Sequence, residues 1–383
     1  MKNQLFLIAT FLISSFHIQA QSAYKTLLFI GSYTDEKPDK GIYIYEFDEN
    51  TGTLKALANG NQITNPSYLN ISPNGKFLYA NTETRTPYSG SISAFNIDSL
   101  SGQISPINMK FSGGANPVYL DIYSSGRYLV NANYTGGSVS LFEINTDGSL
   151  NNYQFLYQFK DSSIIKKRQE SSHIHSANFS PDFKYVYLPD LGADKIRVFE
   201  FHPDSNVQLF ENKQLEVKTK PGSGPRHFTF HPSGKFAYCI EELSGTVCVY
   251  SYLHGKLSEI QSVKSYSKTQ ETYGSADIHI SDDGRFLYAS NRWDNENTIS
   301  VFKVITDGKL QLIQHQKTGG DHPRNFTLDP SGQFLLVANL ISNNIVVFRR
   351  DIKTGLLSST KNEIKIPSPS CLKMRRYIKH STQ

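Results

Sequence analysis

Short runs of alternating apolar and polar residues, separated by tight turns, fill most of this 383-residue chain. In residues 65–79, an alternating run leads into the turn Pro73-Asn74-Gly75, and a second apolar run follows the turn. A third run covers residues 91–95, and a fourth lies beyond the next turn. Alternation with a period of two is typical of β-strands, and helical periodicity is absent from these stretches. The pattern therefore predicts units of four antiparallel strands.

This unit recurs along the chain at intervals of roughly 50 residues, which is the sequence form of a β-propeller blade. The first two strands of six copies lie in residues 65–79, 116–130, 173–187, 224–238, 274–288 and 322–336. Turn residues such as Pro, Asn, Asp and Gly separate the two strands, because they fix φ or tolerate a positive φ. Residues 162–172 form an extra polar loop before the third copy. A tandem of β-sandwiches would not keep one four-strand period over such a length.

A seventh unit is split between the two ends of the chain. Residues 27–54 match only the later strands of the pattern, and residues 368–373 align with the missing first strand. We therefore predict an all-β fold, a single seven-bladed β-propeller with four antiparallel strands per blade. The N- and C-terminal strands share one blade and close the ring, which removes open sheet edges. The predicted core spans about residues 24–374, with no internal domain boundary.

The first twenty residues have the pattern of a secretory signal peptide. Lys2 precedes an apolar run at 5–16, and Ala20 stands before polar sequence. The run is too short to span a bilayer, which needs about 20 apolar residues. We predict a signal peptide at 1–20 and a propeller domain at 21–383. The mature protein, beginning at Gln21, is expected to be periplasmic or extracellular and free of the membrane.

Charge and cysteine content exclude several classes of protein. The chain has 39 basic and 34 acidic residues without a long basic stripe, so nucleic-acid binding is not expected. Three cysteines cannot build a disulfide framework or a metal cluster, and no histidine group has zinc spacing. A disulfide between Cys239 and Cys248, on adjacent predicted strands, stays open. We expect a monomer without metal or cofactor.

Two aligned repeat positions carry unusual chemistry where the other positions are apolar or turn-forming. The third residue of each unit is, in order, Ser67, Val118, His175, Arg226, Ala276, Arg324 and Ser370. The residue that ends the second strand is Glu83, Tyr134, Leu191, Glu242, Arg292, Leu340 and Tyr33. In a propeller, both positions meet at one rim of the central channel. The charged members form either a structural ion-pair network or a binding site.

The excess of arginine at this rim favours a binding site for an anion. Several guanidinium groups near one point repel unless carboxylates or an anionic ligand compensate them. Arginine also binds carboxylate and phosphate with two parallel hydrogen bonds. We therefore expect Arg324 to bind substrate, with help from His173, His227 and Glu241 beside the rim. If the rim is solvated, replacing Arg226 or Glu242 is expected to cost activity and little stability.

Several short motifs resemble the seven-bladed propeller lactonase family, which includes propeller-type 6-phosphogluconolactonases and fungal carboxymuconate lactonising enzymes. The motifs are Gly31-Ser32-Tyr33-Thr34, Asn65-Pro66-Ser67-Tyr68, Gly224-Pro225-Arg226-His227, Glu241-Glu242, Ser290-Asn291-Arg292 and Ser368-Pro369-Ser370-Cys371-Leu372. The resemblance implies a catalytic set of one His, two Arg and one Glu. Carried onto this sequence, the set is His175, Arg226, Glu242 and Arg292. The phosphogluconolactonase pathway is cytoplasmic, whereas this chain has an export signal, which puts a phosphorylated substrate in question.

Three functions follow from the resemblance and the residues. The first is a hydrolase that opens an anionic or sugar-derived lactone, with Glu242 or His175 as the general base and with Arg226 and Arg292 stabilising the oxyanion. The second is a cycloisomerase that forms a lactone from a muconate-like acid with the same residues. The third is a non-enzymatic binding platform, because fold alone does not determine function.

Overall fold

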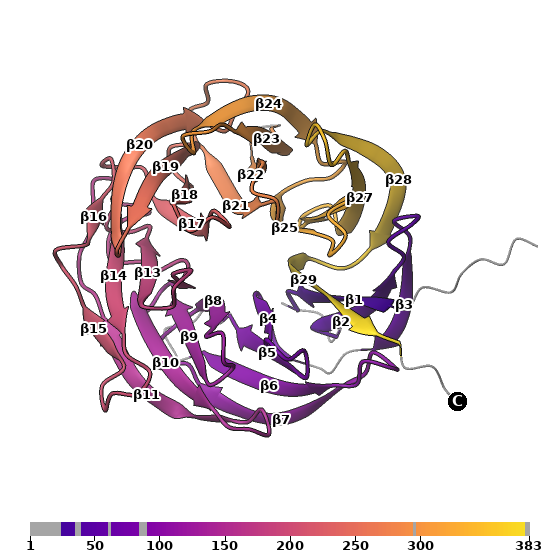
Figure 1. Ribbon diagram of the computed structural model, residues 1–383, viewed down its shortest axis with the longest axis horizontal. Coiled ribbons are helices and arrows are strands. Elements are labelled where there is room, and N and C mark those ends of the chain that lie inside the picture. The colour runs from indigo at the N-terminus through magenta and orange to yellow at the C-terminus, as the bar shows by residue number, and fades with distance from the viewer. Residues whose placement is uncertain (1–23, 35–39, 60–62, 84–89, 294–295, 380–383) are drawn as a thin grey trace, which may run out of the picture.

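Seven β-sheets stand like blades around a central axis in the computed structural model (Figure 1), which describes residues 24–34, 40–59, 63–83, 90–293 and 296–379. Six sheets have four strands, and one has a fifth, β16, paired with β14. The predicted signal peptide, 1–20, lies outside the described residues. The predicted fold class is confirmed.

The strands of each blade run antiparallel from the axis outward. The inner strands are β4 (Leu69–Ile71), β8 (Pro117–Ile122), β12 (Asn178–Phe179), β17 (Pro225–Phe230), β21 (Gly274–Ile280), β25 (Pro323–Leu328) and β29 (Pro369–Ile378). The second strands are β1 (Tyr24–Ser32), β5 (Phe77–Thr82), β9 (Tyr128–Asn133), β13 (Tyr185–Asp190), β18 (Phe236–Glu241), β22 (Phe286–Arg292) and β26 (Phe334–Asn339). We call the face at which inner strands begin the upper face, and the opposite face the lower face.

Two further strands complete each blade on the outside. The third strands are β2 (Ile42–Phe47), β6 (Ser91–Ile97), β10 (Ser138–Ile144), β14 (Lys195–Phe201), β19 (Thr246–Leu253), β23 (Thr298–Val304) and β27 (Asn344–Arg350). The outer strands are β3 (Leu54–Asn59), β7 (Ile104–Phe111), β11 (Leu150–Gln158), β15 (Leu209–Glu211) with β16 (Val217–Lys218), β20 (Lys256–Lys264), β24 (Leu310–Lys317) and β28 (Leu357–Lys365). Burial falls along this order, because the second strands pack on both faces while the outer strands meet water.

The ends of the chain share one blade, as the split repeat predicts. Strand β29 pairs antiparallel with β1, so the sheet order is β29-β1-β2-β3. Apolar side chains of β1, such as Leu28 and Ile30, pack against Leu336 and Ala338 of the neighbouring blade. Backbone hydrogen bonds between β1 and β29 therefore hold the closing blade together, and an apolar core packs it against the neighbouring blade.

A recurring tyrosine contact joins neighbouring blades. The hydroxyl groups of four second-strand tyrosines donate to the carbonyl oxygen of a turn glycine in the next blade, at 2.6–3.0 Å. The pairs are Tyr79 with Gly148, Tyr187 with Gly255, Tyr238 with Gly308, and Tyr288 with Gly355. These glycines have φ between 76° and 84°, a conformation that favours glycine. The Tyr and Gly positions of the repeat thus specify packing between blades.

The extra loop at 162–172 contains no strand and folds over the upper face. Gln169 is buried and donates to the carbonyl oxygen of Leu191 at 2.9 Å, and Ser163 contacts Asp194. These contacts tie the loop to the end of β13. The loop therefore has a defined position from which Arg168 reaches the axis.

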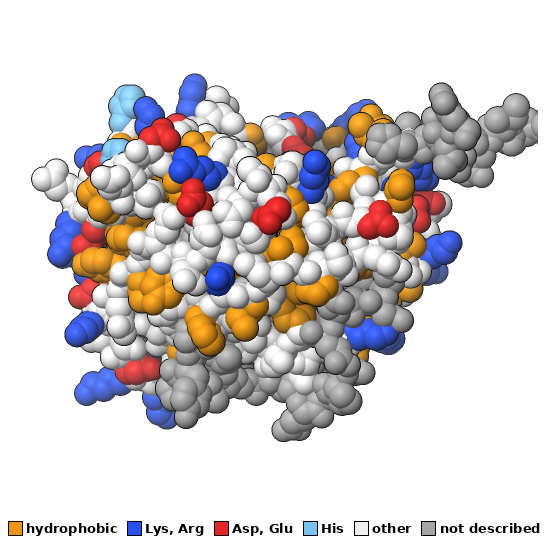
Figure 2. Space-filling view, turned by 90° about the horizontal axis from the view of Figure 1, so that it is seen from below, with side chains coloured by type: hydrophobic (Ala, Val, Ile, Leu, Met, Phe, Trp, Pro, Cys, Tyr) orange, Lys and Arg blue, Asp and Glu red, His pale blue; other side chains and the backbone are white. Residues whose placement is uncertain are grey.

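The outer wall carries several groups of apolar side chains and scattered charged ones (Figure 2). Strands β7 and β11 expose Met109, Phe111, Tyr153 and Leu156. The described residues contain no helix with the length and apolar character that a membrane crossing needs. Cys239 and Cys248 face each other on β18 and β19, and both are free thiols.

Removing the last strand is expected to prevent stable folding. A chain ending at Pro367 lacks β29 and with it the buried side chains of Cys371 and Leu372. The open edge of β1 would then be free to pair with other molecules. Thermal melting and size-exclusion chromatography should reveal aggregation or loss of the folding transition. A chain ending at Lys379 keeps β29 and is the control; a truncated monomer that melts like the full chain would refute ring closure.

Candidate functional site

An irregularity in the inner strands determines which side chains face the axis at the upper face. In β17, the pairing with β18 shifts register between Pro225 and His227. Comparable shifts occur in β8, β21, β25 and β29. A bulge of this kind turns two consecutive side chains towards one face of a sheet. Arg226 and His227 therefore both approach the axis, where strict alternation would send them to opposite faces.

Glu242 is the centre of a buried group of charged side chains. Its Oε2 lies 2.5 Å from Arg226 Nη1 and 3.3 Å from Arg292 Nη2. Its Oε1 lies 2.5 Å from Arg168 Nη2, which comes from the extra loop. Nε2 of His175 contacts Arg226 Nη1. We call these five residues the Glu242 cluster.

Backbone carbonyl groups of the next blade aim two of the arginines at Glu242. Arg226 Nε donates to the carbonyl oxygen of Ala276 at 2.8 Å, and Arg292 Nε donates to that of Gly274 at 2.7 Å. With Nε held, the terminal nitrogens of both guanidinium groups point to the same carboxylate. Carbonyl groups of β21 thus position both charges before any ligand binds.

A second charged group lies at the same face. Arg324 Nη2 is 3.6 Å from Glu83 Oε2, and the Tyr33 hydroxyl donates to Glu83 Oε2 at 2.5 Å. The Tyr33 ring lies under the Arg324 guanidinium at 5.3 Å. Arg324 is therefore held by one carboxylate and one aromatic face, while part of its side chain stays accessible.

The two groups together carry excess positive charge. Four guanidinium groups face only two carboxylates. Burial and the neighbouring Arg226 lower the pKa of Arg292 to about 9, which still leaves it charged at neutral pH. Burial and the Arg226 charge also hold the pKa of His175 well below its usual value, so this imidazole is neutral. The upper face thus has two uncompensated positive charges, which an anionic ligand would neutralise.

Glu242 is ionised in this environment. Burial opposes its charge, but Arg226, Arg292 and Arg168 outweigh that effect and hold the pKa of Glu242 well below its usual range. Both carboxylate oxygens contact guanidinium groups. The arrangement makes Glu242 a weak proton acceptor and a strong anchor for the arginines.

The structure brings together the four residues expected to be catalytic, and it shows that they are buried, so the condition of a solvated rim is not met. His175, Arg226, Glu242 and Arg292 are each 5% exposed or less. The ion-pair network expected as the alternative does exist, and it is the same group of residues. Replacing one of its charged members will therefore affect stability as well as any activity.

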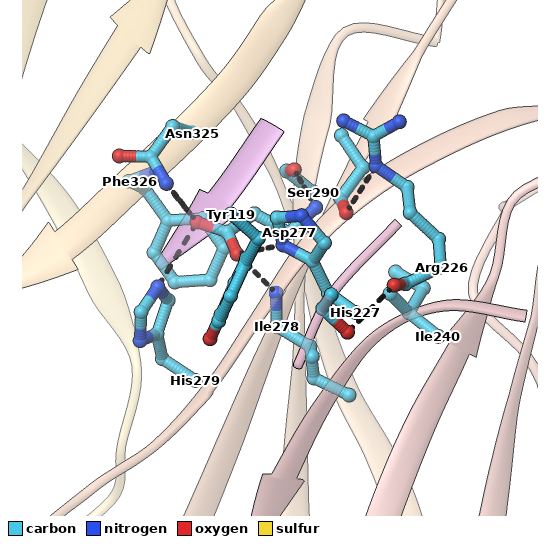
Figure 3. A network of polar contacts seen from close by, with 12 residues as sticks. Tyr119, Arg226, His227, Ile240, Asp277, Ile278, His279, Ser290, Asn325 and Phe326 are labelled. Carbon is cyan, nitrogen blue, oxygen red and sulfur yellow. Dashed lines mark hydrogen bonds and ion pairs between the residues drawn. The ribbon is translucent and has the colours of Figure 1, made fainter. Parts of the chain in front are cut away.

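The other expected site residues lie at different distances from the cluster. The His173 ring stacks on Tyr134 at 4.4 Å, beside the upper face. Glu241 accepts hydrogen bonds from Ser244 and Thr246 in its own blade. The His227 ring lies 5.3 Å from that of His175, and His227 pairs with Asp277 (Figure 3). None of these three side chains contacts the Glu242 carboxylate, so we assign none of them a substrate contact below.

Arg168 and the surroundings of Arg292 complete the site beyond the expected set. Arg168 lies outside the repeat alignment, and only the basic run Lys166-Lys167-Arg168 in an extra loop could have indicated it. His322 Nε2 lies 3.1 Å from Arg292 Nη1, and its Nδ1 accepts from Trp293 Nε1 at 3.2 Å. Arg292 is thus supported by the following blade as well as by its own.

Comparisons with known proteins agree with this architecture. Residues 27–374 match the family model described as Lactonase, 7-bladed beta-propeller. A 6-phosphogluconolactonase of Formosa agariphila is 47% identical over 351 residues, covering 91% of this chain and 99% of the relative. A 6-phosphogluconolactonase of Bacillus subtilis is 32% identical over 363 residues, covering 92% and 99%.

A solved structure extends the likeness to three dimensions. The periplasmic gluconolactonase of Pseudomonas aeruginosa superposes with a TM-score of 0.86 at 34% identity, covering 92% of this chain and 99% of that one. The match includes all seven blades of the ring described above. The resemblance inferred from the short motifs is confirmed, and the chain belongs to the seven-bladed β-propeller lactonase family.

Proposed function

We propose that this protein is a lactone hydrolase that opens an anionic, sugar-derived lactone at the upper face of the ring. The observation that carries the proposal is the pair of uncompensated positive charges beside a neutral imidazole. The relatives named as 6-phosphogluconolactonase and periplasmic gluconolactonase support lactone opening over lactone formation or a purely binding role. The functional unit that we propose is a single chain, because one propeller supplies every residue of the cluster.

His175 is the general base in this proposal. Its Nε2 faces a guanidinium donor, so Nε2 carries the lone pair and Nδ1 the proton. An anionic substrate that draws the Arg226 guanidinium towards itself would free this lone pair for a water molecule. The substrate's negative charge would also raise the proton affinity of His175, which the arginines suppress. Glu242 has no comparable freedom, because its two oxygens hold three arginines.

Arg226 and Arg292 stabilise the charge that develops during the reaction. Water adds to the lactone carbonyl carbon, and the carbonyl oxygen becomes an oxyanion that the two guanidinium groups can bind. The ring C–O bond then breaks, and the proton held by His175 passes to the leaving alkoxide. The products on one open chain are a hydroxyl group and a carboxylic acid, which releases its proton to solvent and becomes a carboxylate. Water is the only co-reactant.

Arg324 is expected to select for a charged group away from the reacting carbonyl. Because a charge-assisted hydrogen bond contributes about 1.5–3 kcal/mol, Arg324→Gln should raise KM for 6-phosphogluconolactone about 10- to 100-fold. KM for the uncharged gluconolactone should change little. Steady-state kinetics with both lactones test lactone hydrolysis and the role of Arg324 in the same experiment. Arg127→Gln, which alters an exposed arginine in the turn between β8 and β9 at the lower face, is the control; equal effects on both lactones would contradict the assignment.

We also propose that the protein is exported after cleavage behind Ala20. The support is the sequence pattern of residues 1–20 and the likeness to a gluconolactonase named as periplasmic. Intact-mass measurement of the protein from its native cells should find Gln21 as the first residue. Recovery of a soluble protein that keeps Met1 would exclude export and favour an intracellular sugar phosphate as the substrate.

A further inference from the structure

Below the Glu242 cluster, two more layers of inner-strand side chains line the axis. The middle layer consists of Tyr68, Tyr119, Ser176, His227, Asp277, Asn325 and Cys371. The lower layer, two residues further along each strand, consists of Asn70, Asp121, Asn178, Thr229, His279, Thr327 and Lys373. All seven members of the lower layer are polar.

The middle layer separates the lower layer from the upper face. Tyr68 stacks on Tyr119 with ring centroids 4.2 Å apart, and Tyr119 meets the His227 ring at 5.2 Å. His227 Nδ1 lies 2.7 Å from Asp277 Oδ1, and Asn325 Nδ2 donates to Asp277 Oδ2 at 2.5 Å (Figure 3). Apart from Tyr119, the members of this layer are 5% exposed or less. A ligand at the lower face would thus lie outside the proposed active site.

A cavity of about 420 Å³ opens at the lower face, inside the range of about 300–1,000 Å³ typical of small-molecule sites. Its walls are partly aromatic, with Tyr119, Phe179, Phe183 and Phe230. The polar part of the wall comprises Asp121, Asn178, His279 and Lys373, among others. Strands from most of the blades meet here, so the cavity is a feature of the closed ring.

One polar group in this wall lacks a partner. Asn178 Nδ2 donates to the Tyr119 hydroxyl at 2.8 Å, but its Oδ1 is buried and has no hydrogen-bond partner among the described residues. A buried acceptor without a partner costs about 1–3 kcal/mol. A hydroxyl group in the cavity could donate to it.

The charge of the cavity differs from that of the upper face. Lys373 contacts the Tyr68 hydroxyl at 3.2 Å, and its positive charge acts on the carboxyl group of Asp121 in the same wall. The carboxylate oxygens of Asp277 are already in polar contact with His227, His279 and Asn325. The cavity therefore offers donors, acceptors and aromatic faces without a large excess of either charge.

We propose that this lower cavity is a second binding site, for an uncharged sugar or polyol. A hydroxyl group can accept a hydrogen bond from Lys373. It can also donate one to Asn178 Oδ1 or to the Asp121 carboxylate. The C–H faces of a sugar ring can pack on the aromatic walls. A lactone anion would instead prefer the upper face, where the arginines lie.

Ligand-observed NMR with D-glucose as the probe tests this site on the full mature chain. We expect saturable, weak binding that Asn178→Ala and Asp121→Asn each weaken about two- to tenfold, the effect of one lost hydrogen bond. Thr327→Ala, in the same layer but outside the cavity wall, is the matched control and should bind like the wild type. Inorganic phosphate should not compete with glucose.

The lower site is independent of the proposed function, and the same samples distinguish the two. Lactone turnover of Asn178→Ala should stay within about twofold of the wild type, because the middle layer lies between. The proposal would be overturned if glucose gave no saturable signal at tens of millimolar. It would also be overturned if the wild type and both cavity variants bound glucose with equal affinity. Loss of glucose binding in Arg324→Gln, or competition by phosphate, would assign the sugar to the upper face and overturn it as well.

Discussion

His175→Gln is expected to lower kcat on an anionic lactone by about 10²–10⁴-fold, the usual contribution of a general base. The glutamine amide oxygen can still accept from Arg226, but it cannot take a proton from water. The exchange replaces one neutral buried side chain with another, because burial and Arg226 keep the pKa of His175 well below its usual value. The melting temperature should therefore change by only a few degrees.

The neighbouring histidine provides the control for this experiment. His173 stacks on Tyr134 and does not contact Arg226 or Glu242, so His173→Gln should keep most of the turnover. Turnover and melting should be measured on the same preparations. If His175→Gln retains wild-type kcat, His175 is not the base and the proposed mechanism fails.

Glu242→Gln is expected to lower both stability and turnover. Breaking a buried ion pair by removing one partner costs about 3–5 kcal/mol, and here one carboxylate balances three guanidinium groups. The freed arginines would move apart, so the oxyanion site would lose its geometry. Denaturant unfolding measures the free energy of unfolding. The activity is measured as turnover per folded molecule.

A surface carboxylate is the matched control for Glu242. Glu170 is exposed and pairs with His173 on the same extra loop that carries Arg168. Exposed pairs contribute about 0–1 kcal/mol, so Glu170→Gln should leave stability nearly unchanged. An unaltered unfolding midpoint in Glu242→Gln would mean that the arginines are solvated in solution and that the buried ion pairs contribute no stability. Unaltered turnover would remove Glu242 from the site.

Most of the fold could be predicted because the copies of the repeat can be aligned with one another within this one sequence. Four strands recur with the same turn positions, and a fragment at each end completes the seventh unit. The same alignment brought His175, Arg226, Glu242 and Arg292 to one rim, because the start of an inner strand lies beside the end of the second strand. Here the repeat supplied long-range information that a single sequence usually lacks.

The remaining features depend on contacts that no repeat position encodes. Arg168 comes from the extra loop, and its direction depends on how Gln169 and Ser163 anchor that loop. Burial of the Glu242 cluster also escaped prediction, since the sequence shows charges at a rim but not how closely they pack. Glu241 follows the alternation of β18 away from Glu242, and a stricter use of that alternation would have excluded it from the site.

The central claim is that the Glu242 cluster hydrolyses an anionic lactone. Its most direct test is the initial rate of base uptake after the purified mature protein is mixed with 6-phosphogluconolactone, since opening the ring creates one new carboxylic acid. We expect a wild-type rate far above spontaneous hydrolysis, and a rate close to the spontaneous one for His175→Gln at equal folded concentration. A wild-type rate no greater than the spontaneous one, with both the phosphorylated and the uncharged lactone, would contradict it.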